Sequence, residues 1–117
     1  MTRSGQCLCG AIRYQLSGEP KSVALCHCAD CRRSAGAPVV AWAMFPEAAL
    51  TLTQGTPKTI NSSATAMRSF CADCGSGLFY RNEKTCPALL MCSQGRSMTR
   101  MRCRRRCRCR PPSAWAG

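Results

Sequence analysis

The sequence predicts a single small domain that is mostly β. Three observations lead to this class. A chain of 117 residues is long enough for one hydrophobic core. Several short segments alternate apolar and polar residues, which is the pattern of a half-buried strand, and turn residues separate them. No segment has the pattern of a long amphipathic helix.

The expected elements follow one another along the chain as short strands. Ile12, Tyr14 and Leu16 alternate with polar neighbours, and a turn sequence, "SGEP", follows them. The apolar run between Pro38 and Pro46 is β-branched at its start and too short for a helix, so we interpret it as a buried strand. Strands are expected at residues 11–16, 22–25, 38–45, 50–53, 66–70 and 77–80.

Seven of the 12 cysteines precede Thr85, and they form three clusters with close spacing. The tetrapeptide "CADC" occurs in two of these clusters. A structural zinc takes four tetrahedral ligands, whereas a catalytic zinc takes three protein ligands and keeps one position open. Seven cysteines would therefore supply the four ligands of one structural zinc and the three ligands of one catalytic zinc. The partition that needs the fewest assumptions gives Cys7, Cys9, Cys71 and Cys74 to a closed structural zinc, and Cys26, Cys28 and Cys31 to an open zinc beside Arg32 and Arg33.

Other uses of the cysteines stay open at this point. The first residues, "MTRSGQCLCG", lack the apolar core of a secretory signal, and no apolar run is long enough to span a membrane. We therefore expect a cytoplasmic protein without a membrane partner, where disulfides are disfavoured. A thioredoxin-like redox pair and a purely structural two-zinc module are further alternatives. His27 is an additional candidate ligand, although adjacent residues in an extended segment point apart.

Three motifs identify a family resemblance. The segments "GQCLCGAIRY", "CHCADCRRSAGAP" and "SFCADCGSGLFY" resemble, in this order, the glutathione-dependent formaldehyde-activating enzymes and the centromere-protein-V-like proteins, over about residues 5–82. The resemblance implies a β-tent zinc fold. It assigns a structural zinc to Cys7, Cys9, Cys71 and Cys74 and a catalytic zinc to Cys26, Cys28 and Cys31.

The resemblance also implies an activity. The expected enzyme is a carbon–sulfur lyase that forms or cleaves the adduct of formaldehyde with glutathione, so its partners are a small thiol and an aldehyde. In this hypothesis the open zinc binds the sulfur of glutathione, and Arg32 or Arg33 binds a carboxylate of the peptide. The alternative is a non-catalytic zinc module that binds a protein or a nucleic acid.

The last part of the chain departs from the family pattern. Residues 1–85 hold nine basic and all five acidic residues, whereas residues 86–117 hold eight arginines and no acidic residue. Reading any cysteine codon one base earlier gives Leu, Met or Val, so Cys107 and Cys109 would become alternating aliphatic residues as in a strand. We therefore expect a zinc-binding domain at residues 1–85 and an out-of-frame tail at 86–117 that contributes no strand and impairs activity. A basic nucleic-acid-binding tail and a third zinc site at Cys103, Cys107 and Cys109 are the alternatives.

Overall fold

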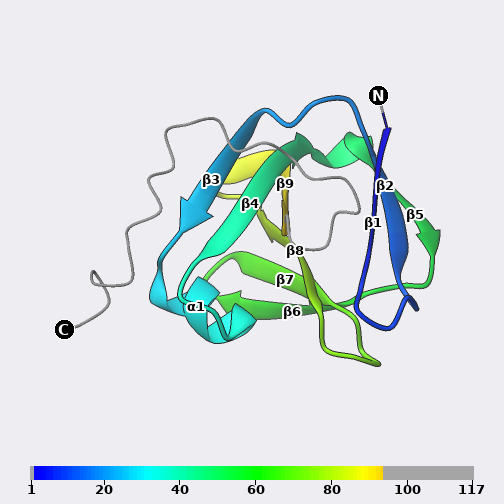
Figure 1. Ribbon diagram of the computed structural model, residues 1–117. Coiled ribbons are helices and arrows are strands. Elements are labelled where there is room, and N and C mark those ends of the chain that lie inside the picture. The colour runs from blue at the N-terminus through cyan, green and yellow to red at the C-terminus, as the bar shows by residue number, and fades with distance from the viewer. Residues whose placement is uncertain (1, 94–117) are drawn as a thin grey trace.

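The computed structural model describes residues 2–93, which form two antiparallel sheets and one short α-helix (Figure 1). The smaller sheet contains, in spatial order, β1 (Thr2–Gln6), β2 (Arg13–Ser17) and β5 (Leu50–Gln54). The larger sheet contains, in spatial order, β3 (Ser22–Cys26), β4 (Val40–Pro46), β9 (Cys86–Ser93), β8 (Gly77–Asn82), β7 (Ala66–Phe70) and β6 (Lys58–Ser63). Helix α1 (Ala29–Ala35) joins β3 to β4, and a 3₁₀ turn, η1 (Glu47–Ala49), joins β4 to β5.

The main hydrophobic core contains side chains from both sheets. Tyr14 and Leu16 on β2 meet Phe45, Phe79 and Leu90 from the larger sheet, and each of these side chains is almost completely buried. The rings of Tyr14 and Phe79 pack edge to face with their centroids 4.9 Å apart. Full burial of each large apolar side chain contributes about 1.5–3 kcal/mol. The core therefore holds the two sheets against each other.

A second, smaller cluster lies on the opposite face of the larger sheet. Because side chains alternate along a strand, Trp42 and Met91 point away from the main core and pack with Tyr80 and Cys31. Cys31 belongs to α1, so this cluster packs the helix against the sheet. Figure 1 shows α1 beside β6 and β7, and Ser63 at the end of β6 donates a hydrogen bond to the carboxylate of Asp30 over 3.3 Å.

The predicted mostly β class is confirmed, and all six predicted strands are present, as β2, β3, β4, β5, β7 and β8, with ends that differ from the expected ones by at most two residues. Three further strands, β1, β6 and β9, were not predicted. β1 and β6 have polar sequences, "TRSGQ" and "KTINSS", and every residue of β6 is exposed. Both lie at the edge of a sheet, where a strand needs no apolar face. Within residues 2–93, neither helix has the length and apolar composition needed to cross a membrane.

The strand after Thr85 corrects an expectation. The sequence predicts that residues 86–93 belong to a tail without strands, but they form β9, which lies between β4 and β8 inside the larger sheet. Leu90 and Cys92 on this strand are completely buried. The rest of the predicted tail, including Cys103, Cys107 and Cys109, lies outside the described residues. The out-of-frame origin and the boundary after Thr85 stay predictions.

Candidate metal centres and the adjacent cavity

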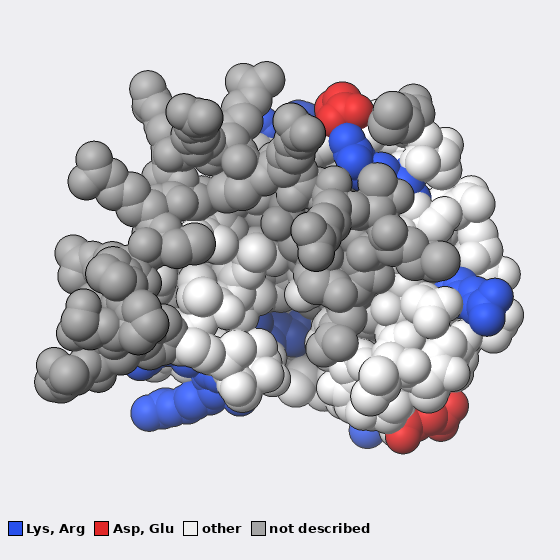
Figure 2. Space-filling view, in the orientation of Figure 1, with Lys and Arg blue, Asp and Glu red and all other residues white. Residues whose placement is uncertain are grey.

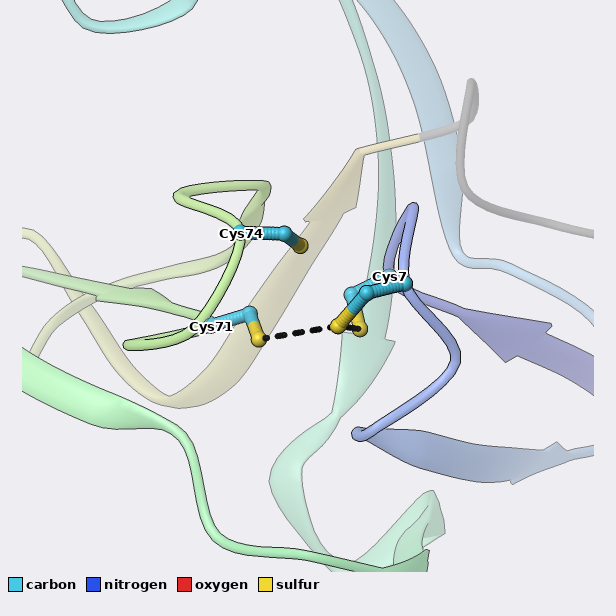
Figure 3. Close-up of side chains that lie close together, drawn as sticks. Cys7, Cys71 and Cys74 are labelled. Carbon is cyan, nitrogen blue, oxygen red and sulfur yellow. Dashed lines mark hydrogen bonds between the residues drawn. The ribbon is translucent and has the colours of Figure 1, made fainter.

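Four cysteines that are far apart in the sequence meet where the two sheets join. Cys7 and Cys9 lie in the turn after β1, and Cys71 and Cys74 lie in the turn between β7 and β8. Figure 3 shows the side chains of Cys7, Cys71 and Cys74 pointing toward one another from these turns. The four sulfur atoms all lie within 4.8 Å of one another, so this four-cysteine group could hold a metal ion.

Each of the two turns has a glycine directly after its second cysteine. Gly10 directly follows Cys9 and Gly75 directly follows Cys74, with φ angles of 79° and 76°. Glycine adopts this left-handed conformation without steric cost, so the chain can reverse immediately after each second cysteine. The backbone N–H of Gly10 donates to the carbonyl of Cys7 over 3.2 Å, and that of Gly75 donates to the carbonyl of Cys71 over 2.8 Å. Both turns therefore present their two cysteines on one side.

Ser76 links the two turns and acts on a sulfur atom. Its buried hydroxyl accepts a hydrogen bond from the backbone N–H of Leu8 over 3.0 Å and lies 3.2 Å from the sulfur of Cys74. The side-chain hydrogen bond from Ser76, together with its backbone N–H, lowers the pKa of Cys74 to about 5. Cys7 also accepts a hydrogen bond, from the backbone N–H of Ile12 over 3.3 Å. Such donors stabilise the thiolate form, which is the form that binds metal.

The sulfur spacing in the four-cysteine group fits zinc. A tetrahedral zinc with bonds of about 2.3 Å to sulfur has sulfur–sulfur edges of about 3.8 Å. The sulfur of Cys9 lies 3.6 Å from that of Cys7 and 3.8 Å from that of Cys71. Two of the four side chains, Cys7 and Cys71, are buried, as expected for a closed site. Every cysteine of the described residues is a free thiol.

The second group has three cysteines, which come from consecutive elements. Cys26 ends β3, Cys28 caps α1, and Cys31 lies buried in the first turn of α1, with the three sulfur atoms within 4.8 Å of one another. The sulfur of Cys28 accepts the backbone N–H of Cys31 over 3.3 Å, and this hydrogen bond lowers the pKa of Cys28. Burial raises the pKa of Cys26 to about 11. His27 is exposed and does not belong to this three-cysteine group.

A cavity of about 380 Å³ has residues near both cysteine groups in its wall; Arg68, one of these residues, contacts the sulfur of Cys31, and none of the described cysteines lines the cavity. Its volume is within the range of pockets that bind small molecules. Helix α1 contributes Asp30 and Arg33 to its wall, and β7 contributes Arg68. Trp42 and Phe79 are among its apolar residues. The cavity therefore combines two positive charges, one negative charge and apolar surface, which suits a small molecule with several charged groups.

The two predicted arginines lie in different positions. Both arginines are exposed, but Arg33 lines the cavity, whereas Arg32 is not among the described residues of the cavity wall. Arg68 was not predicted from the sequence, although it lines the cavity and its guanidinium donates a hydrogen bond to the sulfur of Cys31 over 3.6 Å. Ser76 was also missed. In both cases the only available signal was a polar residue next to the second "CADC" motif.

Charge is dispersed over the part of the described surface that is visible in Figure 2. On the face in Figure 2, basic side chains of the described residues are separated by uncharged surface, and acidic side chains lie among them. Arg3 pairs with Glu19, and Arg81 pairs with Glu47 over 2.7 Å. The visible described surface on this face therefore lacks one continuous basic patch.

Comparison with known proteins identifies a family. Residues 2–108 match the family model described as glutathione-dependent formaldehyde-activating enzyme, which confirms the predicted resemblance. A Schizosaccharomyces pombe protein described as an uncharacterized lyase is 32% identical over 76 residues, which cover 65% of this chain and 55% of that protein. The chain thus matches just over half the length of that relative. A crystal structure of a Rhodobacter sphaeroides protein has a TM-score of 0.62 at 19% identity, covering 97% of this chain and 95% of that chain, so the two share a fold.

Proposed function

Because the chain belongs to the glutathione-dependent formaldehyde-activating enzyme family, we propose that it is a carbon–sulfur lyase that acts on the adduct of glutathione with formaldehyde. The observation that carries this proposal is the pairing of a three-cysteine group with a charged cavity. Three protein ligands are typical of a catalytic zinc, whereas four are typical of a structural zinc.

The residues divide into two metal-binding roles. Cys7, Cys9, Cys71 and Cys74 would hold a structural zinc that joins the turn after β1 to the turn after β7. Cys26, Cys28 and Cys31 would hold a second zinc next to Arg68 of the cavity wall. When bound there, zinc supplies an exchangeable coordination position at which a thiol is deprotonated.

The cavity offers binding groups for the rest of the substrate. Glutathione has two carboxylates and one ammonium group in addition to its thiol. The guanidinium of Arg33 is suited to a carboxylate, and the carboxylate of Asp30 is suited to the ammonium group. Apolar residues such as Trp42 and Phe79 form another part of the wall and would limit the contact of a bound substrate with water.

The reaction balances without an oxidant or a reductant. In the direction of synthesis, the thiol of glutathione releases its proton, its sulfur forms a bond to the aldehyde carbon as the π bond of the carbonyl opens, and the carbonyl oxygen, which receives that electron pair, takes up a proton. Cleavage is the reverse. Residues that hold the two reactants together convert an encounter of two molecules into a step within one complex.

The experiment measures exchange between free formaldehyde and the glutathione adduct by NMR exchange spectroscopy, with and without the zinc-loaded full chain. We expect the protein to accelerate exchange and Cys28→Ser to abolish the acceleration. Cys86→Ser, which changes a half-buried cysteine outside both groups, is the matched control and should keep the activity. Full activity in Cys28→Ser would refute the proposal. Binding of two zinc ions without any acceleration would favour the non-catalytic zinc module instead.

A further inference from the structure

Arg68 connects the cavity to the three-cysteine group. Its side chain is half-buried on β7, and one terminal nitrogen donates to the sulfur of Cys31 over 3.6 Å. Two other contacts fix the guanidinium. Its Nε donates to the hydroxyl of Ser62 over 3.2 Å, and its Cζ lies 5.0 Å from the ring centroid of Tyr80, within cation–π distance. The guanidinium is thus held at the sulfur by contacts on several sides.

The strand register explains this placement. Arg68 on β7 is directly opposite Tyr80 on β8, so both side chains lie on the face of the sheet that α1 covers. Arg81 follows Tyr80, lies on the other face and pairs with Glu47 on η1. The sheet therefore carries two half-buried arginines with different partners. Arg68 contacts the three-cysteine group, and Arg81 binds the carboxylate of Glu47 on the other face.

Charge arithmetic indicates what Arg68 does. Three ionised cysteines around a divalent zinc carry one net negative charge, and a thiolate as fourth ligand raises this to two. The positive charge of the Arg68 guanidinium beside Cys31 offsets one of these negative charges. A neutral fourth ligand gains much less from the guanidinium because it adds no charge.

We infer that Arg68 is a positioning residue that holds Cys31 and makes the three-cysteine group selective for an anionic sulfur as fourth ligand. This inference rests on the proposed function, because it assumes that the three cysteines hold a metal with one exchangeable position. The inference explains why the metal would prefer a thiolate as its fourth ligand, and the residue responsible, Arg68, lies outside the cysteine motifs.

The test compares two ligands on the same protein. The full chain is loaded with Co²⁺, and β-mercaptoethanol or imidazole is added while the visible absorption of the metal is recorded. The quantity measured is the ratio of the thiol affinity to the imidazole affinity. A variant that merely loosens the site weakens both ligands and leaves this ratio unchanged. Arg68→Met and Arg68→Lys are compared with the wild-type chain, and Arg81→Met is the matched control.

We expect Arg68→Met to lower the ratio by about 10- to 100-fold, the size of effect that groups hydrogen-bonded to metal ligands have on metal sites. Arg68→Lys should recover part of the ratio because it keeps the charge, and Arg81→Met should match the wild type. The absorption of Co²⁺ in the four-cysteine group shows in each variant that the domain is folded. If Arg68→Met does not fold by this criterion, the ratio is compared between Arg68→Lys and the wild-type chain instead. We then expect a several-fold reduction in Arg68→Lys, because lysine lacks the planar fork of the guanidinium.

Three outcomes would overturn the inference. The first is an unchanged ratio in the folded Arg68→Met or, where that variant does not fold, in Arg68→Lys. The second is an equal reduction in Arg81→Met. The third is a wild-type chain that binds no thiol, which would overturn the proposed function as well. Selective thiol binding without exchange of formaldehyde would refute the proposed activity alone and leave the role of Arg68 supported.

Discussion

Replacing Gly5 by alanine is expected to destabilise the fold, because the ring of Tyr14 packs directly against the Cα of Gly5. The two residues are opposite each other in the register of β1 and β2. A methyl group added at Gly5 would lie 2.7 Å from Cε2 of Tyr14 and closer still to the Cζ and hydroxyl oxygen of that ring. Carbon atoms in contact normally lie about 3.5–4.0 Å apart, so the ring would have to move by about 1 Å.

The ring of Tyr14 has little room to move. It is 1% exposed, it packs edge to face on Phe79, and its hydroxyl lies 3.2 Å from the sulfur of Cys92. Overpacking of a core costs about 1–3 kcal/mol. Loss of the buried hydrogen bond to Cys92 adds about 1 kcal/mol. We therefore expect Gly5→Ala to lower the free energy of unfolding by about 2–4 kcal/mol, which corresponds to a fall in Tm of about 10 °C or more.

The assay is denaturant unfolding of the zinc-loaded full chain at a fixed zinc concentration, since bound metal shifts apparent stability. Gly77→Ala is the matched control, because an added methyl group at this strand position meets no atom within 4 Å. A Tyr14→Leu background should reduce the penalty of Gly5→Ala, since the clash disappears with the ring. Two results would refute the reasoning. One is a change below about 0.5 kcal/mol in Gly5→Ala. The other is an equal loss in Gly77→Ala.

Three further predictions concern the core and the thiols. Leu90→Ala should lower the free energy of unfolding by about 2–5 kcal/mol, because Leu90 is completely buried; a loss below about 1 kcal/mol in denaturant unfolding would contradict its place in the core. Cys92 should resist iodoacetamide in the native protein at neutral pH, since burial raises its pKa to about 11; its rapid modification, detected by mass spectrometry, would show that the core is open. In the metal-free protein, Ser76→Ala should move the midpoint of Cys74 alkylation to higher pH, because the side-chain hydrogen bond from Ser76 is the largest of the contributions that lower the pKa of Cys74 to about 5. This lowered pKa stabilises the native state fully above about pH 9, and the stabilisation is lost as the pH falls toward 5, so an unchanged alkylation midpoint would disprove the role of Ser76.

The sequence predicted the elements that have a buried face. β2 was recognisable because Tyr14 and Leu16 alternate with exposed polar residues, and β4 because an apolar run has prolines at both ends. β6 has no such signal because all its residues are exposed. β9 was not predicted because residues 86–117 were interpreted as an out-of-frame tail; its sequence, "CPALLMCS", also has a proline near its start and no clear period of two.

The grouping of the cysteines could be predicted because metal chemistry restricts how seven ligands divide. The grouping by sulfur distance in the structure is the same as the predicted one. The role of Arg68 could not be predicted in this way. Its partner Cys31 is 37 residues away in the sequence, and the contact depends on the register of β7 with β8 and on how α1 packs against the sheet. Long-range pairs of this kind have no local sequence pattern.

The central position of β9 determines the order in which the domain can be assembled during synthesis. A chain leaves the ribosome from its N-terminus, so Cys74, the last of the seven cysteines in the two groups, emerges before Cys86, where β9 begins. β4 and β8 have no strand between them until β9 arrives, and β9 must pair with both. The cysteine groups can therefore capture metal while the larger sheet is still in two parts. In such a nascent chain the four-cysteine group would tie the turn after β1 to the turn before β8, and β9 would complete a sheet whose halves are already tethered.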